Sequence, residues 1–89
     1  MLKIEYSPKF ARTYKRIPLL VKKKAEEKEN LFRQNPFNPK LKTHKLKGRL
    51  KNYWAFSINN QYRIIFSFIS KNKVRFHTIG LHNIYYQSL

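Results

Sequence analysis

The last third of the chain, residues 52–86, is the stretch that most limits how this sequence can fold. Three runs of alternating apolar and polar residues, 53–58, 62–69 and 73–80, are separated by two short polar stretches. Runs of this kind, bounded by Asn, Gln, Ser and Lys, are typical of strands joined by tight turns. The sequence therefore predicts three consecutive antiparallel strands, and the remainder of the chain has to cover one face of their sheet.

The N-terminal half supplies the segments that can cover this face. Residues 2–6 alternate as a short strand, and Ser7-Pro8 then has the pattern of a helix cap followed by proline at the first helical position. A helix over 8–17 ends before Pro18, and a second helix over 19–34 ends at the N-P-F-N-P break.

These elements predict the fold class and the domain count. The order β-α-α-β-β-β is typical of an α+β fold, with two N-terminal helices packed on one face of a four-stranded, mostly antiparallel sheet. A chain of 89 residues has room for a single domain, so we expect one domain over 1–89.

The register of the strands decides which side chains share a face. A three-residue first turn places Trp54 opposite Phe66 and Phe56 opposite Ile64, so that large apolar residues meet. The second turn then pairs Phe66 with Phe76 and Ile64 with Thr78. The predicted helix-covered face consists of Trp54, Phe56, Ile58, Tyr62, Ile64, Phe66, Phe68, Val74, Phe76 and Thr78. The predicted open face, which we interpret as a binding surface, carries Tyr53, Ser57, Arg63, Ile65, Ser67, Arg75, His77 and Ile79.

The net charge of the chain indicates which classes of partner it can bind. Twenty Lys and Arg and only four Glu, with no Asp, give a formal net charge of +16. Such an excess of positive charge favours nucleic acid as the binding partner, and an acidic protein is the second choice. An anionic membrane surface fits less well, because no segment joins a basic face to a broad apolar one. No signal peptide, membrane span or cysteine is present in the sequence, so we expect a cytoplasmic protein with no disulfide.

The basic segment 40–51 and the open face provide the candidate phosphate contacts. Leu41, Leu46 and Leu50 are expected to anchor this segment to the core while its cations remain in water, and Gly48 is expected to mark a turn. The predicted RNA- and phosphate-binding residues are Lys42, Lys45, Lys47, Arg49, Lys51, Arg75 and His77.

The side chains available for catalysis exclude several kinds of chemistry. All four Glu lie in the N-terminal third, the three histidines lack metal-ligand spacing, and no glycine-rich phosphate loop exists. We therefore expect no metal and no cofactor. His, Arg, Lys and Tyr suffice for RNA cleavage by the substrate's own 2′-hydroxyl, which needs a base, an acid and cations around the phosphate.

Several motifs, taken in order, connect this chain to a known family. They are S-P-K-F, N-P-F-N-P, H-K-L-K-G-R-L-K-N-Y-W, Q-Y-R-I-I-F and a closing G-x-H-x-x-x-Y made by Gly80, His82 and Tyr86. With these motifs the chain resembles the RelE/ParE superfamily of bacterial toxins from type II toxin–antitoxin systems, in its RelE-like mRNA interferase branch.

The resemblance implies a function and a set of partners. It implies an endoribonuclease that cleaves mRNA in the ribosomal A site and so inhibits translation. It also implies a cognate antitoxin that wraps the toxin with an acidic or amphipathic segment. The toxin–antitoxin complex is expected to bind operator DNA through the antitoxin.

The resemblance also implies roles for individual residues. By position, Arg63 is similar to the arginine that stabilises the scissile phosphate, and His82 to the acid–base residue near the C-terminus. Tyr86 matches an aromatic residue that stacks on or orients a base, and His44 matches a histidine that some branches use.

The general base stays open at this point. Some family members carry a carboxylate or further histidine on the central hairpin, where this chain has Ser57, Asn59, Asn60 and Gln61. The base is therefore His82, His44 or a lysine such as Lys47.

Two other functions remain as alternatives. One is a DNA gyrase inhibitor of the ParE kind, and the other is a basic RNA-binding module without catalysis. The combination of His82 with Arg63 favours the nuclease, because a protein that only binds gyrase needs no acid–base residue.

Overall fold

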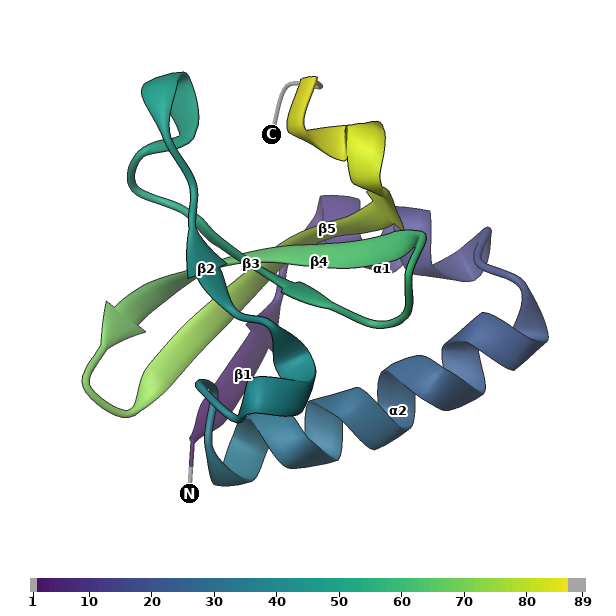
Figure 1. The fold of residues 1–89 in the computed structure, drawn as a ribbon, viewed down its shortest axis with the longest axis horizontal. Helices are drawn as coiled ribbons and strands as arrows, with labels where there is room; N and C mark the ends of the chain where they lie inside the picture. The colour runs from purple at the N-terminus through teal and green to yellow at the C-terminus, as the bar shows by residue number, and fades with distance from the viewer. Residues whose placement is uncertain (1, 87–89) are drawn as a thin grey trace.

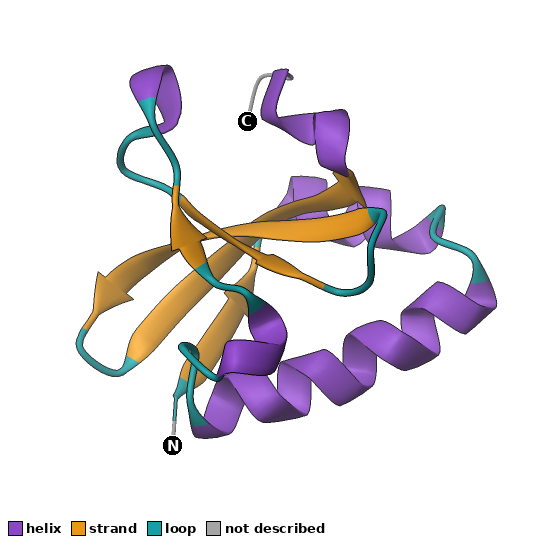
Figure 2. Cartoon of the chain, viewed as in Figure 1, coloured by secondary structure: helices purple, strands orange, loops and turns teal. Residues whose placement is uncertain are grey.

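The computed structural model describes residues 2–86, apart from the side chain of Tyr86, and shows a five-stranded sheet flanked by two helices (Figure 1, Figure 2). The strands run in the order β1-β5-β4-β3-β2, with β1 parallel to β5 and all other neighbours antiparallel. The elements are β1 (Lys3–Tyr6), α1 (Pro8–Lys15), α2 (Leu19–Gln34), the 3₁₀ turn η1 (Pro39–Leu41), β2 (His44–Lys45), the 3₁₀ turn η2 (Gly48–Leu50), β3 (Trp54–Ser57), β4 (Tyr62–Ser70), β5 (Lys73–Leu81) and the 3₁₀ turn η3 (His82–Tyr86).

The predicted α+β class is confirmed, with one strand more than expected. The extra strand β2 has only two residues, which pair with Ala55 and Trp54 of β3. A segment this short has no alternation of its own, so its pairing depends on the neighbouring strand rather than on a local pattern. No helix between residues 2 and 86 is long and apolar enough to cross a membrane.

The start of α1 is fixed to the sheet by its cap. The Ser7 hydroxyl oxygen accepts a hydrogen bond from the Phe10 N–H at 3.0 Å and donates one to the His77 carbonyl of β5 at 2.9 Å. The helix ends at Lys15, two residues before the predicted end, because its last turn tightens into 3₁₀ bonds from Arg16 and Ile17. The second helix, α2, has the predicted bounds.

The main core lies between the helices and the sheet and is built from aromatic rings. Phe32 of α2 is fully buried, and its ring centroid lies 4.8 Å from that of Phe56, 4.9 Å from that of Phe66 and 5.3 Å from that of Phe76. Aromatic pairs in such stacked and edge-to-face arrangements contribute about 0.5–1.5 kcal/mol beyond their burial. Phe32 thus joins α2 to the three central strands.

The predicted register holds for most pairs but fails near the end of β5. Trp54 pairs with Phe66, Phe56 with Ile64, and Phe66 with Phe76, as expected. Beyond a register shift at His77, however, Ile64 pairs with Ile79. The prediction that Ile64 faces Thr78 is therefore wrong.

This β-bulge exchanges the faces of two residues. Thr78 instead pairs with Ile65, so it lies on the side of the sheet away from the helices, whereas Ile79 joins the main core. A bulge inserts one extra residue into a strand. Its trace in the sequence is the pair of polar residues His77 and Thr78 between Phe76 and Ile79, where the apolar alternation shifts by one position.

The side of the sheet away from α1 and α2, called the outer face below, is less open than predicted. Its centre is covered by an apolar cluster, called the outer cluster, in which Ala55 and Ile65 are fully buried. The remaining members come from the η2 loop and from η3, which both rise on this side of the sheet in Figure 1. The outer cluster consists of Leu46, Leu50, Ala55, Ile65 and Ile84.

The η2 loop depends on the glycine that was expected to form a turn. Gly48 has φ +65°, in the left-handed region that a residue with a Cβ adopts at a cost. This turn lets Leu46 and Leu50 both pack into the outer cluster while the cations of the segment stay exposed. The expected anchoring of the basic segment by its leucines is confirmed, with Leu41 buried in the main core.

Candidate active site

The cluster around Arg63 occupies one end of the outer face. Arg63 is half-buried on β4, where it pairs with Ser57 of β3 and Gly80 of β5. Its Nη1 donates hydrogen bonds to the carbonyl oxygens of Asn59 at 2.7 Å and Tyr62 at 3.1 Å. An arginine has five N–H donors in a rigid fork, so this anchoring fixes the guanidinium through one of its three nitrogens.

Tyr85 of η3 connects Arg63 with His44. Burial raises the pKa of Tyr85, and the charge of Arg63 together with its hydrogen bond acts in the opposite direction. The Tyr85 ring also meets the His44 ring edge to face, with 6.4 Å between the centroids. A single aromatic side chain therefore contacts both the arginine and the histidine.

The backbone fixes the tautomer of His44. This residue lies exposed on β2, with Nδ1 3.1 Å from the Lys42 carbonyl oxygen. Because a carbonyl oxygen only accepts hydrogen bonds, Nδ1 carries the proton of the neutral ring. The remaining nitrogen, Nε2, is then the one that can take up a proton from a substrate.

His82 stands at the start of η3, close in sequence to the strand that pairs with Arg63. Its side chain is exposed, and the two preceding residues, Leu81 and Gly80, pair with Tyr62 and Arg63. The side chain of Tyr86, which the sequence motif also selected, lies outside the described residues.

Tyr85 is the residue of this cluster that the sequence did not indicate. The Y-Y pair at 85–86 was its only signal, and the motif spacing selected the second tyrosine of the pair. The structure brings Arg63, His44 and Tyr85 together, and it places the backbone of His82 beside them.

The basic segment flanks this cluster. Its predicted phosphate-binding residues Lys42, Lys45, Lys47, Arg49 and Lys51 are all exposed. Arg49 donates from Nη2 to the Tyr85 carbonyl oxygen at 2.9 Å and so links the η2 loop to η3. Between them is a cavity of about 290 Å³, lined by Leu46, Lys47, Arg49, Leu50 and Tyr85. The cations of the segment thus stand beside the Arg63 cluster.

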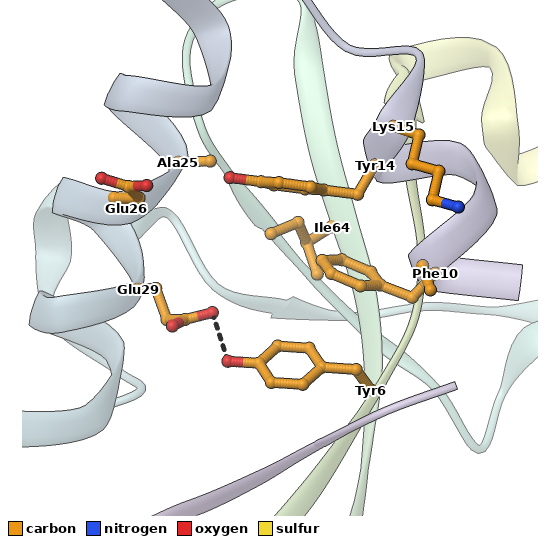
Figure 3. Close-up of a pocket in the computed structure, with 9 residues that line it drawn as sticks. Tyr6, Phe10, Tyr14, Lys15, Ala25, Glu26, Glu29 and Ile64 are labelled. Carbon is orange, nitrogen blue, oxygen red and sulfur yellow. Dashed lines mark hydrogen bonds between the residues drawn. The ribbon is translucent and has the colours of Figure 1, made fainter. Parts of the chain in front are cut away.

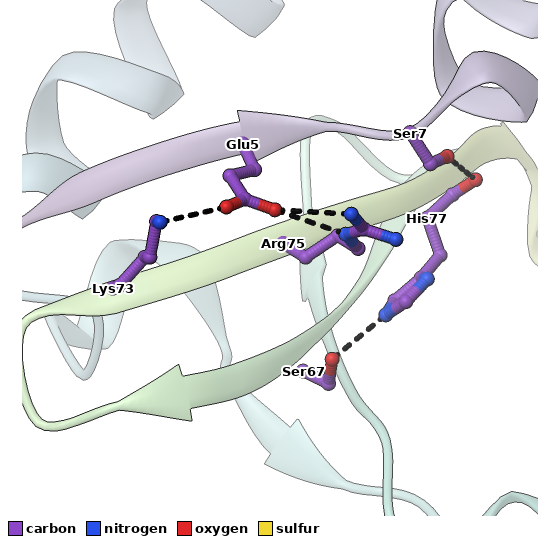
Figure 4. A network of polar contacts seen from close by, with 6 residues as sticks. All are labelled: Glu5, Ser7, Ser67, Lys73, Arg75 and His77. Carbon is purple, nitrogen blue, oxygen red and sulfur yellow. Dashed lines mark hydrogen bonds and ion pairs between the residues drawn. The ribbon is translucent and has the colours of Figure 1, made fainter.

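Arg75 belongs to a separate network at the other end of the outer face (Figure 4). Its guanidinium contacts Oε1 of Glu5 on β1 through Nε and Nη2, both at 3.1 Å, while Lys73 Nζ lies 2.8 Å from Oε2. Hydrogen bonds from Lys73 and then Arg75 lower the pKa of Glu5. A phosphate would have to compete with this carboxylate for Arg75.

His77 lies in the same network. Its Nε2 is 2.7 Å from the Ser67 hydroxyl oxygen, and its ring meets Tyr53 edge to face at 5.0 Å between centroids. Burial, and to a smaller extent the charge of Arg75, lowers the pKa of His77 and favours its neutral form. Ser67 follows Arg63 by four residues on β4, a distance of about 13 Å along a strand. His77 and Arg75 are therefore not part of the Arg63 cluster.

A larger cavity of about 500 Å³ opens on the opposite side of the sheet, between α1 and α2 (Figure 3). Tyr6, Phe10 and Tyr14 form one wall, and the Tyr6 hydroxyl donates to Glu29 Oε1 at 2.9 Å. Burial, followed by the hydrogen bond to Glu29, raises the pKa of Tyr6 to about 12. The cavity is lined by the carboxylates Glu26 and Glu29 but by none of the three histidines, which the proposed RNA chemistry needs. Over residues 2–86, no group of three or more His or Glu side chains could hold a metal ion.

Solved structures of bacterial toxins share this fold. YafQ from Escherichia coli BL21(DE3) is 22% identical with a TM-score of 0.74, covering 97% of this chain and 99% of that one. YoeB in the YoeB–YefM complex from Staphylococcus aureus is 24% identical with a TM-score of 0.73, covering 92% and 98%. The E. coli DinJ–YafQ complex contains a further match, at 23% identity and a TM-score of 0.70, covering 92% and 93%. No curated protein sequence matches this chain.

A family model matches most of the chain directly. Residues 9–82 match the family described as the RelE-like toxin of type II toxin–antitoxin system HigB. The match contains all of α1 but its first residue, together with α2, the basic segment and the strands β3, β4 and β5. Arg63, His44 and His82 lie within it. The chain therefore belongs to the RelE-like toxins of type II toxin–antitoxin systems.

Proposed function

We propose that this chain acts as one toxin domain that cleaves mRNA in the ribosomal A site, in the cytoplasm and without a metal ion. The observation that carries the proposal is the contact of one side chain, Tyr85, with both Arg63 and His44 on a face flanked by exposed lysines. The membership of this chain in the RelE-like toxins supports the same function.

The proposed reaction uses the nucleophile that RNA itself carries. His44 takes the proton of the 2′-hydroxyl at Nε2, and the 2′-oxygen forms a bond to the adjacent phosphorus. The bond from phosphorus to the 5′-oxygen breaks, and protonated His82 gives its proton to that oxygen. The products are a 2′,3′-cyclic phosphate and a 5′-hydroxyl end. Positioned acid and base groups contribute about 10²–10⁴-fold each.

Arg63 is proposed to stabilise the charge that accumulates on the phosphate oxygens. Its guanidinium is already anchored by the Asn59 and Tyr62 carbonyls, so little reorganisation is needed when the transition state forms. The exposed cations of 42–51 would hold the flanking phosphates, and this part of the binding should weaken steeply with salt.

The proposed mechanism differs from others because it depends on a single 2′-hydroxyl of the RNA. Purified toxin should cut ribosome-bound mRNA within translated codons, in the presence of EDTA, and leave a 2′,3′-cyclic phosphate. A single 2′-deoxy nucleotide on the 5′ side of the cut should block cleavage, whereas the same change one nucleotide further upstream should not. Intact mRNA accompanied by DNA damage in induced cells would instead support gyrase as the target and refute the nuclease.

The partners follow from the same proposal. A cognate antitoxin would neutralise the toxin, and the complex would bind operator DNA through the antitoxin. The DinJ–YafQ and YoeB–YefM structures are toxin–antitoxin complexes with toxins of this fold.

Gly80→Ala offers a test of the position of η3. A Cβ at Gly80 would overlap Cγ2 of Ile84, a buried η3 residue, so η3 and its His82 and Tyr85 have to move. A misplacement of about 1 Å in a catalytic group can cost on the order of 10²-fold in rate, and we expect a loss of this size in mRNA cleavage. Far-ultraviolet circular dichroism should show that the sheet remains folded.

A second substitution provides the control for this test. Ile84→Ala in the Gly80→Ala background removes the overlapping methyl and should restore part of the lost cleavage. Full activity of the Gly80→Ala toxin would show that the position of η3 does not matter for the reaction.

A further inference from the structure

A group of large apolar side chains is exposed at the end of the sheet, away from the Arg63 cluster. Phe37 is 52% exposed, Phe68 37% and Ile69, the next residue along β4, 51%, whereas Trp54 is half-buried. The Phe37 ring is 5.5 Å from the Trp54 ring and 6.1 Å from the Phe68 ring, and Trp54 and Phe68 are 5.6 Å apart, measured between centroids. These four residues, Phe37, Trp54, Phe68 and Ile69, are called the aromatic patch below.

The patch exists because α2 stops before this end of the sheet. The helix ends at Gln34, and the following loop turns back, held by a hydrogen bond from the Phe37 N–H to Asn35 Oδ1 at 3.0 Å. Phe37 therefore covers Trp54 and Phe68 only in part, while the β4–β5 turn projects beyond α2 (Figure 1). Exposed apolar groups of this kind on small proteins commonly mark sites of interaction.

The surroundings of the aromatic patch are basic. Lys45 is the cross-strand partner of Trp54, Lys71 lies in the β4–β5 turn, and exposed Lys40 follows Phe37 closely in sequence. The Lys28 ammonium of α2 reaches this loop, 3.3 Å from the Lys40 carbonyl oxygen. No Asp or Glu occurs anywhere after Glu29 in the sequence, so the segments that form the patch contain no acidic side chain.

We propose that the aromatic patch is a docking site for the antitoxin, which would bind it through an acidic segment carrying large apolar side chains. The membership of this chain in the type II toxins means that such a partner exists. Trp and Phe side chains that are clustered and half-exposed have the properties of interface hot spots. Carboxylates flanking the apolar anchors would complement the lysines around the patch and speed association.

The packing of the rings favours a protein over RNA at this place. Single-stranded RNA binds aromatic residues by stacking its bases on open ring faces. Here Phe37 and Phe68 are stacked with an interplanar angle of 23°, and Trp54 meets both edge to face, so each ring already uses part of its surface for contacts with the other two. Aliphatic Ile69 adds apolar area but no group that could hydrogen-bond to a base.

The aromatic patch lies away from the Arg63 cluster, and a partner could bind it without contacting the catalytic residues. Trp54 and Phe68 face the helix side of the sheet, whereas Arg63 and His44 lie on the outer face. An antitoxin anchored at the aromatic patch could hold the toxin without depending on any catalytic side chain. The inference therefore stands independently of the proposed nuclease activity.

Trp54 makes the test direct, because it is the only tryptophan of the chain. The toxin is produced with Arg63→Ala to avoid toxicity, and the full-length antitoxin encoded beside the toxin gene is added after any tryptophan in it has been replaced by phenylalanine. Antitoxin binding should shift the Trp54 emission to shorter wavelength. Phe37→Ser and, separately, Ile69→Ser should each raise the dissociation constant about tenfold or more.

A matched control uses an exposed apolar residue elsewhere. Leu20 on α2 is 78% exposed, and Leu20→Ser should leave the dissociation constant unchanged. Thermal unfolding of each variant checks that the fold is retained, and agreement between Phe37→Ser and Ile69→Ser protects against a local folding defect in one of them.

Two results would overturn the inference. One is antitoxin binding with unchanged affinity in both patch variants and no change in Trp54 emission. The other is a Trp54 shift caused by a single-stranded RNA oligonucleotide and lost in Phe37→Ser, without any effect of this variant on antitoxin binding, which would make the patch an RNA surface.

Discussion

Replacing Arg63 by alanine should lower the rate of mRNA cleavage by about 10²–10³-fold, the usual effect of removing a donor that stabilises the transition state. The reason is the anchored guanidinium, which two backbone carbonyls hold beside Tyr85. The rate should be measured in a single turnover on ribosome-bound mRNA, and growth arrest after induction should disappear in parallel. Arg63→Lys keeps the charge but loses the fork, so it should recover only part of the rate.

The control for this prediction is an arginine on the opposite side of the molecule. Arg12 lies exposed on α1, and Arg12→Ala should cleave at the wild-type rate. An Arg63→Ala toxin that still arrests growth would contradict the assignment of the site. Equal losses in both variants would show that general positive charge, rather than the held guanidinium, is what matters.

Replacing Phe32 by alanine should lower the free energy of unfolding by about 3–5 kcal/mol, the usual cost of truncating a buried phenylalanine. Phe32 is fully buried and contacts three other phenylalanine rings, so the resulting cavity has rigid walls that cannot easily collapse. Small domains have total stabilities of roughly 5–15 kcal/mol, and this variant should therefore lose a large part of its stability. Urea unfolding in an Arg63→Ala background measures the loss.

Leu20→Ala provides the comparison on the same helix. Because Leu20 is largely exposed, its truncation should change the free energy of unfolding by no more than about 0.5 kcal/mol. An unchanged urea midpoint for Phe32→Ala would mean that the contacts of α2 with the sheet contribute little to stability.

Local patterns predicted the helices and most strand pairs but not the features that depend on distant contacts. The matching of Trp54 with Phe66 and of Phe56 with Ile64 followed from the size of the side chains alone. The bulge at His77 was not predicted in this way, because the alternation was continued through the polar pair His77 and Thr78 without the one-residue shift that this pair marks. The outer cluster was missed because Ile84 reaches Ile65 only after the chain has turned from the end of β5 at Leu81 into η3.

In the candidate site, too, local patterns predicted some residues, whereas others depend on distant contacts. Arg63 and His44 stand in recognisable motifs, and the structure connects both of them to one tyrosine. Tyr85 itself could not be chosen from the sequence, because Tyr86 fits the motif spacing. The engagement of Arg75 by Glu5 arises from the pairing of two strands about 70 residues apart, which no local pattern contains.

The parallel pairing of β1 with β5 has a consequence for the folding of this toxin during its synthesis. The strand β1 pairs, from Lys3 to Tyr6, with a segment of β5 that is synthesised much later, from Lys73 to Phe76. Contacts between such distant segments form late, because a long loop has to close before they can be made. A nascent chain thus holds β1 without its partner strand until β5 has been synthesised, 70 residues after Glu5 in the case of its partner Arg75.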